Sequence, residues 1–135
     1  MQIAQSLAGL PAFVAYYIVG GLLLALYGFV YTRLTPYDEM GLIRANNVAA
    51  AIAFAGSILG FMIPLTAAFV NSVGLFDAVI WGLVALAVQV GAYRLARLLI
   101  PGLCDRIPEG EMAPAIYLAV ISLAGGMLQS ACMSY

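Results

Sequence analysis

Four long apolar stretches dominate this sequence and constrain its fold more than any other feature. They cover residues 11–32, 48–70, 78–100 and 112–133. A helix needs about 20 apolar residues to cross the hydrocarbon core of a bilayer. The first, second and fourth stretches meet that length without a charged residue. The sequence therefore predicts a chain that crosses a membrane four times as helices.

The composition excludes a water-soluble domain. Hydrophobic residues make up 65% of the chain and charged residues 8%, and the mean hydropathy is +1.07. Soluble domains carry roughly a quarter charged residues, so lipid must be the solvent for most of this surface. The stretches also lack the apolar–polar alternation of a transmembrane strand. We predict an all-α, polytopic membrane helical bundle in a bacterial inner membrane, with residues 1–135 as one transmembrane domain.

The third stretch is the shortest, because Arg94 interrupts it before it reaches spanning length. Arg94 and Arg97 are three residues apart and so share a helix face. We expect both side chains to snorkel towards the headgroups at one interface. Trp81, near the other end of the stretch, is expected to anchor the helix at the opposite interface.

The arginines predict the orientation of the chain in the membrane. Arg33 and Arg44 flank the first loop, and Arg94, Arg97 and Arg106 lie in or beside the third loop. The N-terminal segment, the second loop and the C-terminus have none. Because cytoplasmic loops carry an excess of positive charge, we expect both termini in the periplasm and the two longer loops in the cytoplasm.

The first loop carries the pattern of a short helix. Thr35 is expected as its N-cap and Pro36 as its first residue, with Asp38 and Glu39 in the first turn. Such a helix could lie in the membrane interface. The alternative is a plain turn with incidental apolar residues.

Two parts of the sequence resemble each other. Residues 55–60 match residues 124–129, and an Arg-Leu pair followed shortly by a proline closes both the first and the third stretch. This pattern predicts two tandem hairpins, residues 11–71 and 76–133, related by an axis along the membrane normal. Chance similarity between apolar segments is the alternative.

Small residues recur at three- and four-residue spacing in the second stretch and gather again in the fourth. Such residues let another helix backbone approach closely, which drives helix association in lipid. We expect them to pack against other helices, and a pore lining is the alternative. The residues are Ala49, Ala53, Gly56, Gly60, Gly125 and Gly126.

Four further positions in the second and third stretches could form either interhelical contacts or a polar pathway. Asn47 stands where a helix cap is expected, and Ser57 and Gln89 lie deeper in the membrane. An amide in hydrocarbon needs a partner, so Gln89 is expected to bond a neighbouring helix. Pro64 removes a backbone donor and could expose a carbonyl for a cation, although most such kinks are structural.

The residues that support enzyme chemistry are scarce. Histidine is absent, which removes the commonest general base and metal ligand. Asp77, at the start of the third stretch, is expected to cap that helix; a proton relay is the alternative. The net charge of −1 gives no reason to expect nucleic-acid binding. We expect no enzyme activity, no catalytic residue, no cofactor and no metal site.

Several short motifs resemble the YjfL-type family of small inner-membrane proteins. The match follows the order and spacing of that family over nearly the whole chain. The resemblance implies four helices in paired two-helix units, no established activity, and a genomic context of phage-shock-like stress proteins and polyamine-type ligases. Asn46 departs from the pattern, because family members often have Gly there, which puts a tight packing contact in doubt. The motifs are residues 35–39, 42–44, 47–51, Gly56, Gly60, 64–65, Trp81-Gly82, Gln89, 97–101, 124–126 and 131–133.

Two functions remain open at this point. The first is an oligomeric structural or interaction protein, in membrane-stress response or envelope maintenance, that recruits a peripheral partner to its cytoplasmic loops. The second is an oligomeric channel for ions or small solutes. The expected partners are the lipid bilayer, further copies of the chain and a peripheral cytoplasmic protein.

Overall fold

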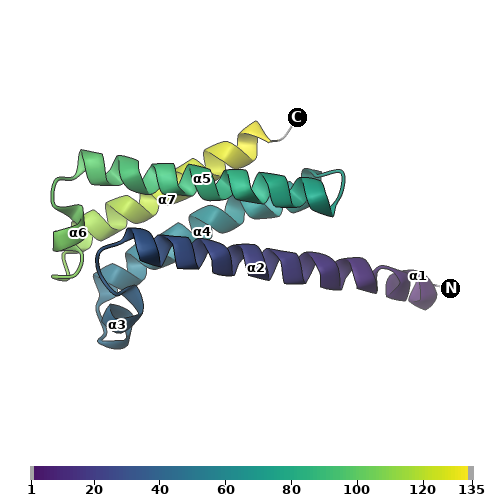
Figure 1. The fold of residues 1–135 in the computed structure, drawn as a ribbon, viewed down its shortest axis with the longest axis horizontal. Helices are drawn as coiled ribbons and strands as arrows, with labels where there is room; N and C mark the ends of the chain where they lie inside the picture. The colour runs from purple at the N-terminus through teal and green to yellow at the C-terminus, as the bar shows by residue number, and fades with distance from the viewer. Residues whose placement is uncertain (1, 134–135) are drawn as a thin grey trace.

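The computed structural model describes residues 2–133, which fold into helices joined by short connections (Figure 1). Four of the helices are long and three are short. They are α1 (Gln2–Ala8), α2 (Leu10–Leu34), α3 (Glu39–Arg44), α4 (Val48–Asn71), α5 (Leu75–Leu99), α6 (Leu103–Arg106) and α7 (Met112–Cys132).

The prediction of an all-α bundle with four membrane-spanning helices is confirmed. Four helices are long and apolar enough to cross a bilayer: Ile3–Leu34, Val48–Asn71, Leu75–Leu99 and Met112–Cys132. The last three end within a few residues of the predicted stretches. The first begins earlier than expected, because α1 continues the apolar helix towards the N-terminus.

The first loop does contain a short helix, but Thr35 does not cap it. Helix α3 begins at Glu39, and Asp38 stands at its N-cap position. Thr35 is instead the C-cap residue of α2: its amide donates to the Tyr31 carbonyl oxygen. The prediction placed the helix start too early because Thr-Pro followed by acids is also compatible with an extended turn.

Asp77 likewise lies in the first turn of its helix and not at the N-cap position. Helix α5 begins at Leu75, with Gly74 at the N-cap position. The Asp77 Oδ2 atom accepts a hydrogen bond of 3.2 Å from the amide of Val73. The carboxylate therefore reaches back to a free amide before the helix, as the acidic residue of a capping box does.

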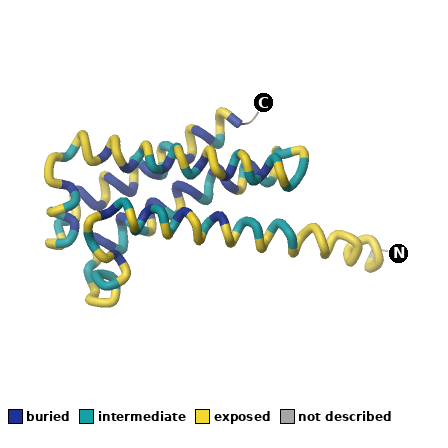
Figure 2. Tube along the Cα trace, in the orientation of Figure 1, coloured by how far each residue is buried: buried dark blue, intermediate teal, exposed yellow. Residues whose placement is uncertain are grey.

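Helices α4, α5 and α7 form the core of the bundle. The closest packing is between α4 and α7, and α5 lies against both. Helices α4 and α7 run parallel, because Asn47 lies beside Pro108 at one end and Gly60 lies beside Gly126 further along. Figure 2 shows buried residues along much of α4 and α7.

Helix α2 packs on this core mainly through its C-terminal half, and its N-terminal half touches α4 only around Phe69. Its buried residues are Leu23, Tyr27 and Tyr31. The Tyr27 ring stacks on Phe61 of α4 with centroids 4.6 Å apart. Figure 1 shows that the N-terminal part of α2 and α1 project past the ends of the other long helices.

The turn between α3 and α4 explains the unusual residue at position 46. Asn46 has φ 66°, the left-handed region that favours glycine and tolerates asparagine. Its side chain is exposed. The backbone conformation, and not close packing, therefore explains why the family that this sequence resembles often has glycine at this position.

Candidate functional site

The parallel contact between α4 and α7 leaves no room for side chains at its centre. A Cβ atom added to Gly126 would fall on the carbonyl oxygen of Gly60, and one added to Gly56 would fall on Ala119. Backbones can come this close only where both helices present small residues. Ala49 and Ala53 continue the same buried surface of α4. Gly125 faces α5 instead, where an added Cβ would lie 3.7 Å from Ala92.

Gln89 joins the three core helices at one point. Its side chain is fully buried, and Nε2 donates to the carbonyl oxygens of Gly60 at 3.0 Å and Ser122 at 3.1 Å. Both oxygens lie where α4 and α7 approach most closely. We call the contact between α4 and α7 the seam. The Gln89 side chain of α5 therefore bonds both helices of the seam and is an interhelical contact.

Ser57 forms a similar interhelical contact between α4 and α2. Its hydroxyl is hydrogen-bonded to the hydroxyl of Tyr27, and both side chains are buried. Pro64 lies inside α4, buried beside this region. Ser57, Pro64 and Gln89 therefore all face the interior of one chain and do not gather on an outer surface.

Asn47 connects the two loops. Its Oδ1 accepts from the amide of Ala50, which caps α4, and its Nδ2 donates to the carbonyl oxygen of Pro108. Both bonds are 3.0 Å long. One side chain therefore fixes the start of α4 and the loop before α7 at the same end of the bundle.

A polar cluster that the sequence did not reveal lies at this end. The hydroxyls of Tyr31 and Tyr37 and the Oε2 atom of Glu39 are buried, and none has a hydrogen-bond partner among the described residues. Nearby, the Tyr93 hydroxyl is hydrogen-bonded to Cys104 Sγ at 3.0 Å. We call this set the loop-end cluster: Tyr31, Thr35, Tyr37, Glu39, Tyr93 and Cys104.

Glu39 is the one buried carboxylate of the described residues. Its side chain is 1% exposed, and the Thr35 hydroxyl donates to its Oε1 atom. Burial, with the charge of neighbouring Asp38, raises the pKa of Glu39 from 4.5 to about 7. Burial, with the nearby Glu39 and Cys104, also raises the pKa of Tyr37 well above its usual range.

The predicted interfacial anchors all lie near the bundle ends. Arg33 lies over the ring of Phe29 at 4.9 Å, and Arg97 over that of Tyr93 at 5.9 Å. Arg44 and Arg94 are exposed. Arg106 forms the single salt bridge found in the described part of the chain, with Glu111 at 3.0 Å. Trp81 is partly exposed near the opposite end of α5.

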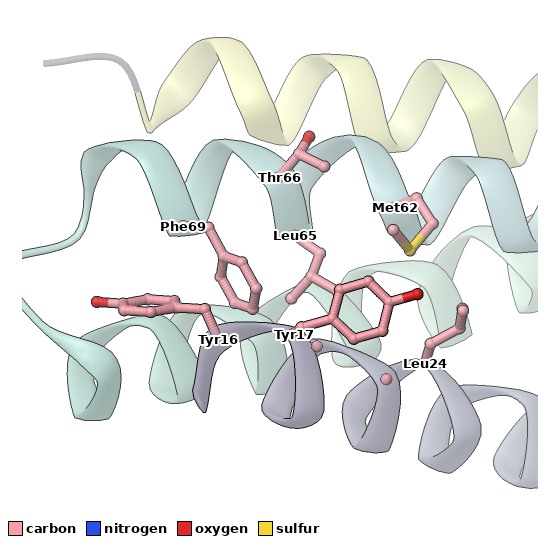
Figure 3. A pocket seen from close by; sticks show the side chains of 9 residues that line it. Tyr16, Tyr17, Leu24, Met62, Leu65, Thr66 and Phe69 are labelled. Carbon is pink, nitrogen blue, oxygen red and sulfur yellow. The ribbon is translucent and has the colours of Figure 1, made fainter. Parts of the chain in front are cut away.

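An apolar groove separates the free part of α2 from α4. It has a volume of about 270 Å³, and Figure 3 shows Tyr16 and Tyr17 on one side with Met62, Leu65 and Phe69 on the other. The Tyr16 and Phe69 rings meet edge to face, 5.2 Å between centroids. This contact is the last aromatic pair between the two helices before α2 leaves the bundle.

Comparison with known proteins identifies the family. The profile of the family described as Domain of Unknown Function (DUF350) matches residues 5–133. The chain belongs to the DUF350 family. It is also 37% identical over 129 residues to the UPF0719 inner membrane protein YjfL of Escherichia coli strain K12 and of E. coli O157:H7. Each match covers 96% of this chain and 98% of the relative.

This membership confirms the resemblance found in the sequence. Together with the four apolar helices, it makes the chain a multi-pass inner-membrane protein. No solved structure matches the chain significantly. Among residues 2–133, no three histidine, cysteine, aspartate or glutamate side chains are close enough together to hold a metal ion.

The sequence analysis of this DUF350 protein did not predict the loop-end cluster. It placed Glu39 in the first turn of a short helix and made no prediction for Tyr31 or Tyr93. One hint was available: the tyrosines stand at or beside the arginine-rich ends of their stretches, where a hydroxyl and an acid can share a protected site.

Proposed function

We propose that this protein is an integral membrane scaffold that self-associates through α2 and presents its two larger loops to a peripheral partner. The observation that carries the proposal is the incomplete attachment of α2. In α4, 50% of the most apolar 18-residue segment is buried inside the chain. In the first span, Ile3–Leu34, 11% of the most apolar 18-residue segment is buried. A helix with so little of its surface buried retains a long face for a second helix.

The free surface of α2 has features that favour helix pairing. Gly21 is exposed, and a Cβ added there would meet nothing within 4 Å. Ala25, one turn further on, is also exposed. Small residues four apart allow a second helix to approach closely. The α4 stripe cannot serve this purpose, since α7 of the same chain already covers Gly56 and Gly60.

The proposed orientation places the loop-end cluster towards the cytoplasm. All five arginines lie at the end of the bundle that carries α3 and α6, or on the last turns leading to it. The positive-inside rule then puts both termini in the periplasm. Alkaline phosphatase fused after residue 135 should be active, and green fluorescent protein fused there should be dark. The reverse pattern would contradict the orientation.

The surface offered to a partner consists of α3, α6 and the loop before α7. The bond between Asn47 and Pro108 ties these segments together, so they form one surface. Met40 is exposed on α3. Affinity capture from native membranes should recover the same peripheral protein with the wild-type chain and with a Gly91→Leu chain, and lose it with Met40→Asp. A role in membrane stress or envelope maintenance rests on the family resemblance alone.

The structure gives less support to the alternative, an oligomeric channel. Ser57 and Gln89, which could have lined a polar pathway, bond other helices of the same chain. The free face of α2 is apolar, so pairing through it would not enclose a polar pore. Liposomes containing the protein should therefore show no ion or small-solute flux. That the chain is not an enzyme stays a prediction.

Two matched glycines test self-association. Gly21 and Gly91 are both exposed, and an added Cβ meets nothing at either position. The backbone at either site therefore has room for a Cβ atom, and thermal unfolding checks that each leucine variant keeps the fold of one chain. Gly21→Leu should lower the oligomer mass measured in lipid nanodiscs, while Gly91→Leu on α5 should leave it unchanged. An unchanged mass for Gly21→Leu would contradict the proposal.

A further inference from the structure

Glu39 stands in an unusual environment for an acid at the start of a helix. The first turn of a helix is normally a solvated place that favours a negative charge. Here Asp38 is exposed in that way, but the Glu39 side chain is turned inward and 1% exposed. The Thr35 hydroxyl donates to Oε1 of its carboxyl group, and Oε2 has no partner among the described residues.

Within residues 2–133, no cation compensates this carboxyl group. The titratable groups that face it are Asp38 beside it, Tyr37 in the same connection and Tyr31 from α2. Behind Tyr37 lies Cys104 of α6, hydrogen-bonded to Tyr93 of α5. Helix α4, which packs on α3, contributes no ionisable side chain. Asp38 disfavours a negative charge on Glu39, and the tyrosines and Cys104 carry no positive charge that could compensate one.

The arginines nearest in sequence do not fill this role. Arg33 lies over the Phe29 ring and is exposed, and Arg44 is exposed at the far end of α3. Neither forms an ion pair within the described part of the chain, where the one salt bridge joins Arg106 and Glu111. An unpaired carboxylate in a buried site is costly, and such a group retains its proton or moves to water.

We propose that Glu39 is a proton-controlled latch on α3. With the proton bound, the neutral carboxylic acid stays buried in the loop-end cluster, and α3 remains packed against α4. When the proton leaves to solvent, the carboxylate moves out to be hydrated and carries α3 with it. The latch does not depend on self-association or on a partner, although its release would reshape the surface that a cytoplasmic partner meets.

The sign of the effect follows from the direction of the shift. Burial raises the pKa of Glu39 above its ordinary value, so the folded, latched state binds a proton that the released state gives up. The latched state therefore weakens as the pH rises through about 7 and is strongest in acid. Cytoplasmic pH lies in this range, so modest changes would alter how much of the protein is latched.

Infrared spectroscopy tests the proton directly on the full chain in lipid nanodiscs. A carboxylic C=O band should titrate with a midpoint near pH 7 and be missing from a Glu39→Gln chain. In an Asp38→Asn chain the band should remain, with its midpoint moved to lower pH because a neighbouring negative charge is gone. Absence of a band with a near-neutral midpoint, or its loss in Asp38→Asn, would overturn the assignment to Glu39.

Hydrogen exchange tests the movement of α3. At each pH, wild-type and Glu39→Gln chains are compared, because the chemical exchange rate then cancels. The two should exchange residues 37–44 nearly equally at pH 4, where the carboxyl group is mostly protonated in both the latched and the released state. At pH 8 the release of wild type is favoured by the whole shift in the pKa of Glu39 from 4.5 to about 7, so wild type should exchange this segment on the order of a hundredfold faster or more, while the α4 core exchanges equally in both. Equal exchange of residues 37–44 at pH 8 would overturn the latch.

Discussion

Helices α4 and α2 are similar in length and hydropathy, but α4 is largely buried by other helices and α2 is largely exposed. Helix α4 is enclosed: its glycines and alanines let α7 approach to backbone contact, and Gln89 bonds across the seam. Helix α2 is held by aromatic rings and one hydroxyl pair along its C-terminal half. Its remaining apolar length faces outward (Figure 2). Small residues make the contact between α4 and α7, and large exposed apolar residues mark the surface left for lipid or another chain.

The largest expected effect is on the seam between α4 and α7. Gly126→Ala places a methyl group against the Gly60 carbonyl oxygen, so the two backbones must separate. We expect a loss of about 1–3 kcal/mol in the free energy of unfolding, in the range of core overpacking. Thermal unfolding in a mild detergent measures it.

The matched control for that change is on α2. Gly21→Ala meets no neighbour and removes a flexible residue from a helix, so it should be neutral or stabilise by about 0.5–1 kcal/mol. Equal destabilisation by both alanines would remove the distinction between the two helices.

The next effect concerns the bonds that Gln89 makes across the seam. Gln89→Met keeps the size of the side chain but removes both donors to α4 and α7. We expect a cost of about 1–2 kcal/mol, as for other interhelical hydrogen bonds in lipid. Asn71→Ala serves as the control, since that amide bonds its own helix at an exposed position. The expectation fails if both variants melt at the wild-type temperature.

The smallest effect should be confined to α2. Tyr27→Phe keeps the stacking on Phe61 but loses the bond to Ser57, for about 0.5–1.5 kcal/mol. Hydrogen exchange should rise in α2 and stay unchanged in α4. A double-mutant cycle with Ser57→Ala isolates the pair, and zero coupling energy would show that this bond does not hold α2.

Much of the fold could be predicted from the sequence because lipid imposes simple rules. Uninterrupted apolar length predicted the four spans, and the two small-residue segments pointed to close packing. A deep amide needs a partner, so Gln89 was expected to bond a neighbouring helix, although the pattern did not say which one. The partner of each helix depends on the arrangement of all four in space, which hydropathy does not encode.

The part that could not be predicted lies in the loops and in the attachment of α2. Thr35 and Asp77 were assigned as caps from residue type, whereas the helix boundaries depend on where the connecting chain must run. Glu39 is buried near Tyr31 of α2 and Tyr37 of the following connection, a placement that depends on the tertiary fold. The free half of α2 is apolar like its attached half, so hydropathy does not separate them.

One measurement tests the central claim, that α2 offers its free face to a second copy. Single cysteines at Val14, Gly21, Leu23 and Gly91, in a chain with Cys104 and Cys132 replaced by serine, would be oxidised in native membranes. We expect disulfide-linked dimers at Val14 and Gly21, few at Leu23, which is buried, and few at Gly91 on α5. Dimers at Gly91 with none at Val14 or Gly21 would contradict the account.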